Sequence, residues 1–295
     1  MGRKLPAHSF VKLGPVELSI LVISHNSSRV LPECLERLHK YYPHAQQVVV
    51  DAASSDGSLE LARQWPNLKT LSVANRGYAY AVNRGLEVVS GHYVAIMNSD
   101  VYLEAGDLEA LVAALTTHPK AVMAGPVLIT PQGRPQSFGL FYAPYYFNLH
   151  KPRPVTWISG ALIVLRRDHL PQLGGMDERF FFYNEDMEWG IRARRKGFEV
   201  LLIPRKVLHL GGASTPNDPR FIAEGYRGGL LLSQAHYSWI HGLHRKAVLL
   251  EAQLRVTLDP NPKRKAAYKL LLSRLGRQKD LPSSFLLEES SKIHP

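Results

Sequence analysis

Short apolar runs alternate with segments of helical periodicity between residues 18 and 117, and this alternation constrains the fold more than any other feature of the sequence. The apolar runs, each of strand length, are Leu18–Ile23, Gln47–Val50, Leu68–Val73 and His92–Met97. Helical spacing of apolar residues follows each of them, at 30–41, 59–65, 79–89 and 108–117. Strand–helix alternation predicts an α/β fold with a mostly parallel central sheet flanked by helices.

Polar residues follow three of these apolar runs. They are Ser24 and Asn26 after the first, Asp51 after the second, and Asn98, Ser99 and Asp100 after the fourth. Because the carboxyl ends of parallel strands share the edge of the sheet at which ligands bind, we expect these side chains to line one crevice. Carboxylate and amide oxygens suit Mg²⁺ and Mn²⁺, which makes Asp100 a candidate metal ligand. An Asp after a strand also occurs in ordinary turns and helix caps.

The pattern changes after residue 117 and becomes helical towards the C-terminus. Residues 132–154 are rich in proline, glycine and aromatic side chains and predict a long loop. The other predicted elements are strands at Trp157–Leu165 and Val200–Ile203 and helices at Met187–Lys196, 223–258 and 266–275. We therefore expect an α/β catalytic domain over residues 1–222 and a basic helical C-terminal extension over residues 223–295.

Three acids open the helix predicted at 187–196, within the segment Asn184-Glu-Asp-Met-Glu188. Acids in a first turn complement the helix dipole, which is their ordinary role. Here they follow the apolar block Phe180–Tyr183, and a carboxylate in such surroundings has a raised pKa and can act as a general base. His209 ends another apolar run before two glycines, and its imidazole could complete a metal site with Asp100.

Several enzyme classes lack their signatures. The sequence has no GxGxxG after its first strand, no GxxxxGK[ST] and no GxSxG, which counts against dehydrogenases, P-loop kinases and serine hydrolases. The glycine-containing segment 75–85 carries Arg76 and Arg84, whose guanidinium groups suit a diphosphate, a plain surface position being the alternative. A nucleotidyltransferase, with a similar sheet and metal chemistry, stays a second enzyme hypothesis.

Composition sets further limits. The chain has 295 residues and 45% apolar side chains, enough for a packed core. Its one cysteine, Cys34, excludes an internal disulfide and a cysteine-rich zinc site. No apolar run approaches the roughly 18–20 residues that cross a bilayer, and no signal-type run follows the basic N-terminus, so we expect a cytoplasmic protein.

Positive charge is concentrated near the C-terminus. Arg245–Lys279 holds ten Lys/Arg and two Asp/Glu, a net +8 of the chain's formal +11. Such a segment suits anionic lipid or nucleic acid, or forms a solvated helix face. A non-catalytic membrane- or RNA-binding module is therefore the hypothesis from a different class. The leucines of this region form an apolar helix face that we expect to pack on the main domain, namely Leu249, Leu250, Leu254 and Leu258.

Taken in order, these motifs resemble family 2 glycosyltransferases with a GT-A fold, especially the bacterial rhamnosyltransferase-like branch. The resemblance runs from about Leu18 to about Tyr237. It is carried by Val22-Ile-Ser-His-Asn26, Val48-Val-Val-Asp-Ala-Ala-Ser-Ser-Asp-Gly57, Asn75-Arg-Gly77, Asn83-Arg-Gly85, Asn98-Ser-Asp100, Trp157-Ile-Ser-Gly160, Gly175-Met-Asp-Glu178, Glu185-Asp-Met-Glu-Trp189 with Arg192, and His209-Leu-Gly-Gly212.

The resemblance implies roles for individual residues. Asp51 matches the family Asp that contacts the nucleotide base. The donor nucleotide site is implied to comprise Ser24, Asn26, Asp51, Arg76, Asn83, Asn98 and Ser99. Asp100 matches the last Asp of the family's DxD motif and His209 a family His, and together they would bind Mg²⁺ or Mn²⁺. Asn98 stands where many members carry the first Asp, and Ala81 stands where many carry Arg.

Asp186 matches the general base of the family's ED motif, with Glu185 as its rival for that role. The donor sugar or the acceptor would contact Trp157, Ser159, Gly160 and Trp189. The implied reaction moves a sugar with inversion from a dTDP-, UDP- or GDP-sugar, rhamnose being the sugar that the branch indicates, to a hydroxyl of a glycan or lipid-linked acceptor. Asp186 would accept the hydroxyl proton and the metal would neutralise the leaving diphosphate.

The resemblance also bears on partners and place. It indicates polysaccharide or cell-envelope biosynthesis, and no nucleic acid partner is expected. A lipid-linked acceptor requires work at a membrane surface, so we expect a cytoplasmic protein that associates peripherally with the inner face of the plasma membrane through its basic C-terminal region.

Overall fold

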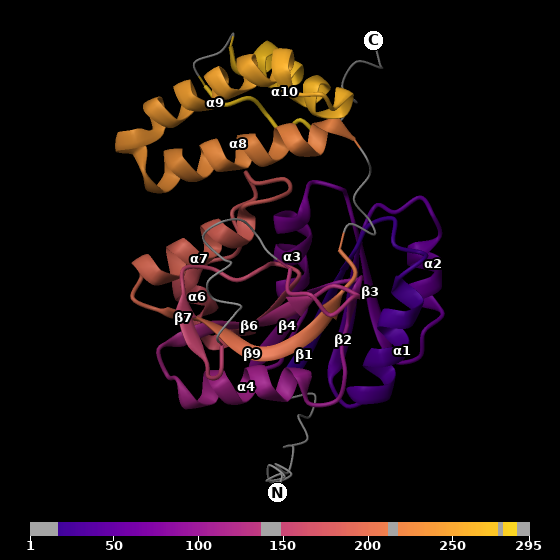
Figure 1. Cartoon of the computed structure of the whole chain (residues 1–295). Helices are drawn as coiled ribbons and strands as arrows, with labels where there is room; N and C mark the ends of the chain where they lie inside the picture. The colour runs from indigo at the N-terminus through magenta and orange to yellow at the C-terminus, as the bar shows by residue number, and fades with distance from the viewer. Residues whose placement is uncertain (1–16, 137–148, 212–217, 277–279, 288–295) are drawn as a thin grey trace, which may run out of the picture.

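The computed structural model describes residues 17–136, 149–211, 218–276 and 280–287. These residues form a mixed sheet with helices on both faces and a separate layer of three helices at one end (Figure 1). The expected loop at 132–154 lies mostly in 137–148, outside the described residues.

The sheet has the strand order β3-β2-β1-β4-β8-β6-β9-β5, with β7 paired to β9. Its first half is parallel and consists of β1 (Leu18–Ser24), β2 (Gln46–Ala52), β3 (Leu68–Val73) and β4 (Tyr93–Asn98). The second half is mixed and consists of β5 (Val101–Tyr102), β6 (Ala121–Ile129), β7 (Arg153–Val155), β8 (Leu162–Arg166) and β9 (Glu199–His209). The parallel prediction therefore holds for the N-terminal half, where the strand–helix alternation is regular.

Helices cover both faces of the sheet, and the side chains of β1 show why. Ile20 and Val22 belong to a core formed with α1 (Leu31–Tyr41), α2 (Ser58–Arg63) and α4 (Asp107–Thr117). Leu21 and Ile23 point to the other face, into a core with α3 (Tyr78–Leu86), α6 (Leu170–Leu173) and α7 (Glu185–Arg195). Because successive residues alternate between two apolar cores, a continuous apolar run is the pattern that a central strand needs.

Two strands differ from the sequence-based expectation. No strand was expected at 121–129, where β6 lies, because Gly125 and Pro126 interrupt this run as breakers do. The β6–β9 register shifts at Pro126, where Ile203 and Lys206 of β9 pair with successive β6 residues, so the irregularity also accommodates Pro204. The strand expected at Trp157–Leu165 begins only at Leu162, and the residues before it form a loop.

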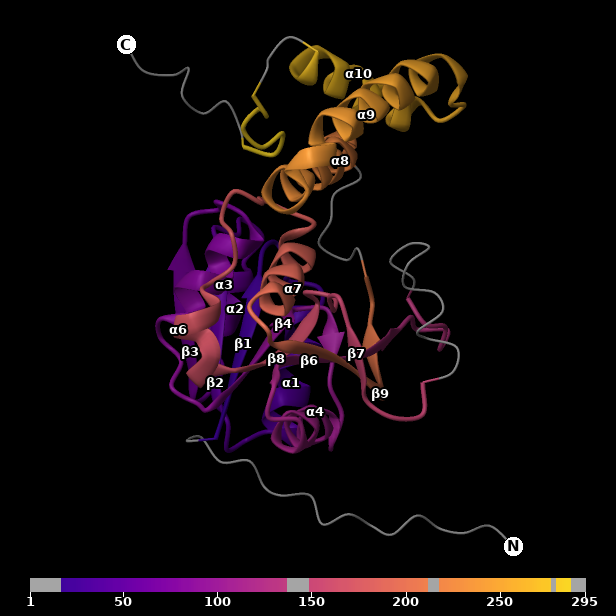
Figure 2. The same cartoon turned by 90° about the vertical axis from the view of Figure 1, so that its left-hand side faces the viewer.

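The C-terminal layer consists of α8 (Pro219–His236), α9 (Ser238–Leu258) and α10 (Pro262–Leu275), which share a core of their own. Figures 1 and 2 show these helices stacked over the end of the body that carries α3 and α7. The helix expected over 223–258 is thus two helices that meet at Tyr237. None of the described helices is both long enough and apolar enough to span a bilayer.

The expectation that the leucine face of α9 packs on the main domain is wrong for all four of its residues. Leu250, Leu254 and Leu258 are exposed, and Leu249 is partly buried. The buried residues of α9 are Val248 and Ala252, which contact the core shared with α8 and α10. Periodicity defined an apolar face but not the direction in which the neighbouring helices would lie.

A buried ion pair holds α8 in place. The Arg227 guanidinium donates to Glu224 Oε1 at 2.9 Å, to the Pro282 carbonyl at 2.7 Å and to the Arg179 carbonyl at 3.1 Å. The other oxygen of Glu224 accepts the Phe285 N–H at 2.8 Å. The pair therefore joins α8 to the C-terminal segment 280–287 and to the loop that leads into α7.

Candidate active site

The parallel strands bring their polar ends to one edge, as predicted. In the sheet register Ser24 pairs with Asp51, and Ile23 pairs with Asn98. Beyond the strand ends, the hydroxyl of Ser99 donates to Ser27 Oγ at 2.8 Å. The ends of β1, β2 and β4 are therefore adjacent in space.

Asp100 and His209 meet because β5 pairs with the end of β9. Val101 lies opposite His209 in this register, and the Leu210 N–H donates to the Asp100 carbonyl at 3.0 Å. The side chains are buried, with Asp100 Oδ1 3.2 Å from His209 Nε2. Residues more than a hundred positions apart are thus brought together by two short strand segments.

Gln136 orients His209 with both ends of its side-chain amide. Its Nε2 donates to the His209 carbonyl at 2.7 Å, so its Oε1 faces His209 Nδ1, also at 2.7 Å. An oxygen in that position accepts a hydrogen bond, which places an imidazole proton on Nδ1. His209 Nε2 then faces Asp100 and is the nitrogen that would bind a metal, since a metal-binding histidine donates its other N–H to an acceptor of this kind.

This pair fits a divalent metal. A carboxylate oxygen and an imidazole nitrogen 3.2 Å apart suit adjacent positions on one octahedral ion, whose ligands stand about 3 Å apart. The described residues hold no group of three or more His, Cys, Asp or Glu side chains around one point. Mg²⁺ and Mn²⁺ commonly take one or two protein ligands and complete their shells with water and substrate phosphate oxygens, so two are sufficient.

Two acids begin α7 beside this pair. Tyr183 and Asn184, with φ values of 70° and 69°, form a tight left-handed turn that places the first residues of the helix against the 159–161 loop. Asp186 Oδ2 accepts the Gly160 N–H at 2.7 Å, and its Oδ1 accepts the Met187 N–H at 2.7 Å. A Cβ at Gly160 would stand 3.3 Å from the Asp186 Cβ, so glycine permits this close approach.

The two acids differ in their surroundings. Glu185 is buried, and its Oε2 has no hydrogen-bond partner among the described residues. Burial raises the pKa of Glu185 well above its usual range, and the charge of Asp186 adds to the rise. Asp186 is less buried, and although burial raises its pKa too, the Gly160 and Met187 N–H groups oppose the rise. Asp186 is therefore better suited to carry a negative charge.

Tyr78 lies beside the loop that contacts Asp186. Its hydroxyl donates to the Gly160 carbonyl at 2.7 Å. Burial raises the pKa of Tyr78, and the charges of Glu185, Asp186 and Asp100 raise it further. Acids from two segments, the start of α7 and the turn after β4, therefore act on one phenol, which keeps its proton and donates a hydrogen bond.

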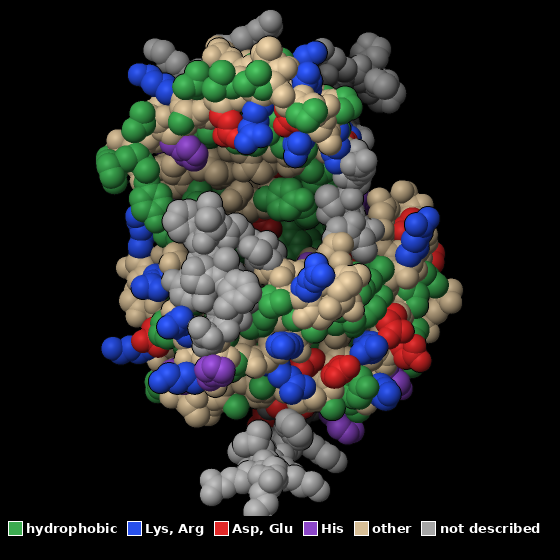
Figure 3. Space-filling view, viewed as in Figure 1, with side chains coloured by type: hydrophobic (Ala, Val, Ile, Leu, Met, Phe, Trp, Pro, Cys, Tyr) green, Lys and Arg blue, Asp and Glu red, His purple; other side chains and the backbone are tan. Residues whose placement is uncertain are grey.

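A cavity of about 320 Å³ lies next to this cluster, between the strand ends and the start of α8. Its polar wall includes His25 and Asn75, and its apolar wall includes Phe181, Phe182, Phe221 and Leu286. Figure 3 shows a hollow between the sheet body and the helical layer, with hydrophobic side chains on its wall. The combination suits a ligand with a polar and an apolar part.

His25 has a defined proton position in this cavity. Its Nδ1 lies 2.7 Å from the Ala52 carbonyl, which can only accept, so Nδ1 carries the proton. Its Nε2 faces the side-chain amides of Asn26 and Asn75 at 3.3 and 3.4 Å. The imidazole is thereby held across the ends of β1 and β2.

Other residues expected in the donor site have local partners. Asp51 accepts the Ser54 N–H at 2.9 Å and the Ser54 hydroxyl at 2.5 Å. Asn26, with φ 49°, accepts the Ser55 N–H and so ties the two strand-end loops together. The Ser24 hydroxyl donates to Ser27 at 3.3 Å. These contacts shape the loops that border the cavity.

Arg76 and Asn83 lie apart from the lining of the cavity. The Arg76 guanidinium stacks on Tyr80, 4.8 Å from the ring centre. The Asn83 amide binds both backbone groups of Met176, at 2.8 and 2.9 Å, and so fastens α3 to the loop before α7. Neither side chain contacts the Asp100–His209 pair.

The residues expected to contact sugar occupy different positions. Trp189 is fully buried in the core, and its indole N–H donates to the Gly174 carbonyl at 2.9 Å. Trp157 packs beneath α7, where its Cβ would stand 2.7 Å from a Cβ at Gly190. Ser159 and Gly160 lie in the loop beside Asp186, the Ser159 hydroxyl accepting the Ala161 N–H at 3.3 Å. Two of the four expected sugar contacts, Ser159 and Gly160, are therefore close to Asp186, whereas the two tryptophans pack in and beneath α7.

Four residues of this site were absent from the expected set. His25 lies inside the strand-end motif that carries the resemblance and could have been found there. Tyr78 follows the glycine of the Asn75-Arg-Gly77 motif, another local signal. Gln136 and Phe221 have no such signal, because their positions depend on contacts between distant segments.

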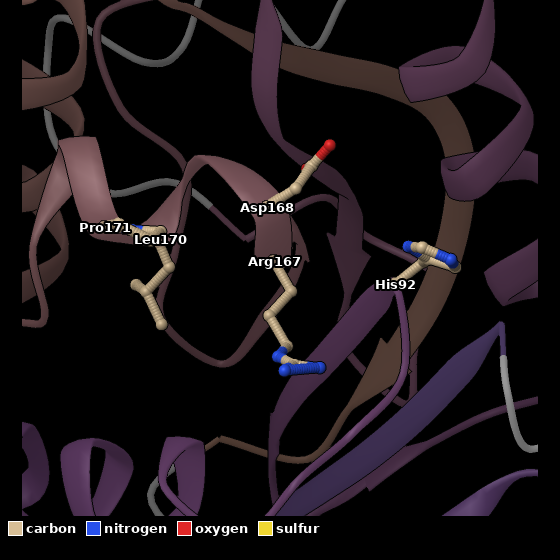
Figure 4. A pocket seen from close by; sticks show the side chains of 5 residues that line it. All are labelled: His92, Arg167, Asp168, Leu170 and Pro171. Carbon is tan, nitrogen blue, oxygen red and sulfur yellow. The ribbon is translucent and has the colours of Figure 1, made fainter.

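A second hollow, of about 470 Å³, lies at the opposite end of β4 and is lined by His92, Arg167, Asp168, Leu170 and Pro171 (Figure 4). His92 directly precedes β4, whereas Asn98 ends it. Arg167 is engaged with this loop, donating to the Ser90 carbonyl at 2.6 Å and to the His92 carbonyl at 2.8 Å. The hollow is thus away from the carboxyl ends of the parallel strands, where ligands of such folds bind.

Comparison with known proteins agrees with this geometry. Residues 19–173 match the family model described as glycosyl transferase family 2. The N-acetylglucosaminyl-diphospho-decaprenol L-rhamnosyltransferase of Mycobacterium tuberculosis is 28% identical over 271 residues, covering 77% of this chain and 88% of that protein. The amylovoran biosynthesis glycosyltransferase AmsE of Erwinia amylovora is 29% identical over 208 residues, covering 66% of this chain and 76% of that protein.

Solved structures share the fold. TarS of S. aureus aligns with a TM-score of 0.58 at 18% identity, covering 88% of this chain and 80% of that chain. The mannosyltransferase PcManGT of Pyrobaculum calidifontis, in complex with GDP-Man and Mn²⁺, aligns with a TM-score of 0.58 at 18% identity, covering 93% and 79%. The likeness to both structures extends over most of the chain. The protein is therefore a nucleotide-sugar glycosyltransferase with a GT-A fold and belongs to glycosyl transferase family 2.

Proposed function

We propose that this glycosyltransferase moves a sugar, with inversion, from a nucleotide-diphosphate donor to a hydroxyl group of a glycan or lipid-linked acceptor. One observation carries the proposal: the loop 159–161 joins the metal-binding side of the site to the acid. The Asn98 N–H donates to the Ala161 carbonyl at 3.0 Å, and the neighbouring Gly160 N–H donates to Asp186 at 2.7 Å. The end of β4, which leads to Asp100, and the proposed base are thereby attached to the same short loop.

The donor would bind along the strand ends. The nucleoside would occupy the cavity lined by His25 and Ala52, and Asp51, Ser24, Asn26, Asn98 and Ser99 would contact the donor from the neighbouring strand ends. Solved structures of similar fold bind UDP, UDP-GlcNAc or GDP-Man, which supports a nucleotide-diphosphate donor. For the sugar we propose rhamnose, supported by the name of the mycobacterial relative.

Asp100 and His209 would hold Mg²⁺ or Mn²⁺ against the donor diphosphate, with Gln136 accepting the Nδ1 proton of His209 in a hydrogen bond and so turning Nε2 towards the ion. The ion, when bound, neutralises charge that develops on the leaving diphosphate. Two solved structures of similar fold were obtained with Mn²⁺, which supports this choice of group. Tyr78 would stabilise the same region by holding the Gly160 carbonyl in place.

Asp186 would accept the proton of the attacking acceptor hydroxyl as the sugar carbon inverts. It is preferred over Glu185 because its carboxylate receives two backbone N–H groups and is less buried. The acceptor would approach past Ser159 and Gly160 and along the apolar wall of the cavity. A lipid-linked glycan, as in the name of the mycobacterial relative, supplies both a sugar hydroxyl and an apolar part.

We propose that the catalytic domain covers residues 1–222 and that residues 223–295 form a helical extension. The separate core of α8, α9 and α10 supports this division, although Pro219 already begins α8. We also propose that the enzyme works on the cytoplasmic side of a membrane, where lipid-linked acceptors are available.

The proposal is tested by measuring release of nucleoside diphosphate from dTDP-rhamnose, UDP-sugars and GDP-mannose, with Mg²⁺, with Mn²⁺ and with chelator. One donor should be turned over and should also raise the melting temperature in the presence of metal. Release of pyrophosphate from a nucleoside triphosphate and a sugar phosphate would instead indicate the nucleotidyltransferase alternative. No turnover or stabilisation with any nucleotide sugar would contradict the proposal.

A further inference from the structure

The outer face of α9 carries a stripe of exposed apolar side chains. Trp239, Leu243, Leu250, Leu254 and Leu258 are 84%, 71%, 58%, 53% and 74% exposed. Their spacings of four, seven, four and four residues keep them on one side of a helix. Because isolated exposed leucines are common but an aligned row of five is not, this surface calls for an occupant. We call these five residues the α9 stripe.

The five residues of the α9 stripe do not belong to the core of the helical layer. The opposite side of α9 is already packed, with Val248 and Ala252 buried against Tyr268 and Leu271 of α10. The stripe therefore faces away from the core of the helical layer. Figure 3 shows a row of hydrophobic side chains along this outermost layer, with Lys and Arg side chains beside it.

Positive charge lies on the same helical layer as the α9 stripe. Lys246 lies on the same helix face, between Leu243 and Leu250, and α10 exposes Arg264 and Lys269. The helix α10 has no acidic residue.

The acids nearby are already paired. Glu251 is bound by Arg255 at 2.6 Å and by the Tyr226 hydroxyl at 3.0 Å. Asp259 is buried against Arg264 at 2.9 Å. A partner of the stripe would thus meet a row of apolar side chains with Lys246 among them and a basic helix, α10, packed against α9.

We propose that the α9 stripe docks the enzyme on an anionic membrane surface. The leucines and Trp239 would enter the boundary between headgroups and acyl chains, while Lys246 and Lys269 contact anionic headgroups. A second copy of the chain fits less well, because two such faces would bring their basic borders together. Nucleic acid fits less well too, because leucine side chains offer phosphate groups neither charge nor hydrogen-bond donors. The proposal does not depend on the transfer reaction.

The test uses the full-length protein and vesicles of phosphatidylcholine alone or with an equal part of phosphatidylglycerol. The wild type should float with the anionic vesicles, bind neutral ones far less, and bind more weakly at high salt. Its Trp emission should shift to shorter wavelength on binding, and this shift should disappear in Trp239→Phe. Failure of the wild type to bind anionic vesicles would overturn the proposal.

Two sets of substitutions separate the apolar and the charged contributions. The triple change Leu243→Gln, Leu250→Gln, Leu254→Gln should lower the vesicle partition coefficient at least about tenfold, because each removes a side chain that the bilayer would bury. Lys246→Gln and Lys269→Gln should each lower it about fivefold, on anionic vesicles only.

The matched control is Leu61→Gln, at an exposed leucine of α2 remote from α9. It should partition as the wild type does. The substituted residues of the stripe and the two lysines are exposed, so melting temperature and nucleoside diphosphate release without membranes should be unchanged in these variants. Unaltered partition of the triple variant, or a stripe-dependent dimer in sedimentation that binds no vesicles, would refute the proposal. Loss of transfer activity alone would bear on the proposed function and not on docking.

Discussion

Replacing each of the two acids at the start of α7 by its amide tests which of them, Asp186 or Glu185, is the general base. Asp186→Asn and Glu185→Gln keep side-chain size and remove one charge each. Asp186 is held by two backbone N–H groups and is partly accessible, whereas Glu185 is buried with one oxygen unpaired among the described residues. Asp186→Asn should therefore mainly lower the rate of catalysis, whereas Glu185→Gln should mainly change stability.

The expected magnitude for Asp186→Asn is a loss of about 10²–10⁴ in kcat, which is the usual contribution of a positioned general base. This corresponds to about 3–5 kcal/mol of transition-state free energy. The amide also presents an NH₂ group towards one of the N–H donors of Gly160 or Met187, so Asp186→Glu serves as a control for the lost carboxylate. Glu185→Gln should reduce kcat by less than about tenfold, because burial favours the uncharged acid there, which is a poor base.

The assay is the pH dependence of turnover with the donor that the nucleoside diphosphate release screen identifies. A base must be ionised, and burial raises the pKa of Asp186, so activity should fall as pH decreases through a value above the ordinary aspartate range near about 3.9. This acidic limb should be preserved in Glu185→Gln. If Glu185→Gln loses turnover a hundredfold or more while Asp186→Asn retains it, the assignment of the base is wrong.

Stability gives an independent readout of Glu185. Its pKa is raised in the folded state, so the folded protein holds this proton more tightly than the unfolded chain does. The resulting stabilisation is present below the unfolded value of about 4.3 and is lost as pH rises through the raised folded value. Glu185→Gln removes that dependence and should gain melting temperature relative to the wild type as pH rises towards neutral. A constant difference between the two across pH would contradict this account.

Three further predictions concern residues that hold His209, α8 and α7 in place. Gln136→Ala should weaken Mn²⁺ binding about 10–100-fold in a spectroscopic titration, because it releases the tautomer of His209, and unchanged affinity would exclude this role. Glu224→Gln should cost about 3–5 kcal/mol in urea unfolding by leaving Arg227 buried without its carboxylate, whereas the double change with Arg227→Met should cost less. Gly190→Ala should cost about 1–3 kcal/mol in thermal unfolding, since its Cβ would stand 2.7 Å from a backbone oxygen; an unchanged melting temperature would show that the helix shifts freely.

The N-terminal half of the fold could be predicted from the sequence because each of its strands is a short apolar run followed by a helix. The same regularity placed Ser24, Asp51 and Asn98 at adjacent strand ends, which the register confirms. The strand β6 was missed because Gly125 and Pro126 weaken its local pattern, and its pairing with β8 and β9 outweighs that weakness. Local periodicity carries no information about such pairing.

The site residues, too, divide into those that the local sequence identifies and those that depend on contacts between distant segments. Residue types and their order along the chain were sufficient to identify the family, the acids at α7 and the Asp100–His209 pair as candidates. Trp189 was placed among the sugar contacts because of its position in a motif, but its side chain fills the core under α7. Gln136 had no motif, and its contact with His209 exists because β9 returns past the end of β6.

The C-terminal helices show the physical reason for this division. An apolar face on α9 is a property of residue spacing and is visible in the sequence. Its direction depends on which side α8 and α10 cover, and they cover Val248 and Ala252. The hydrophobic effect depends on the apolar area removed from water and not on a particular partner or direction. Contacts between distant segments therefore determine which apolar residues form the core and which remain exposed at the surface.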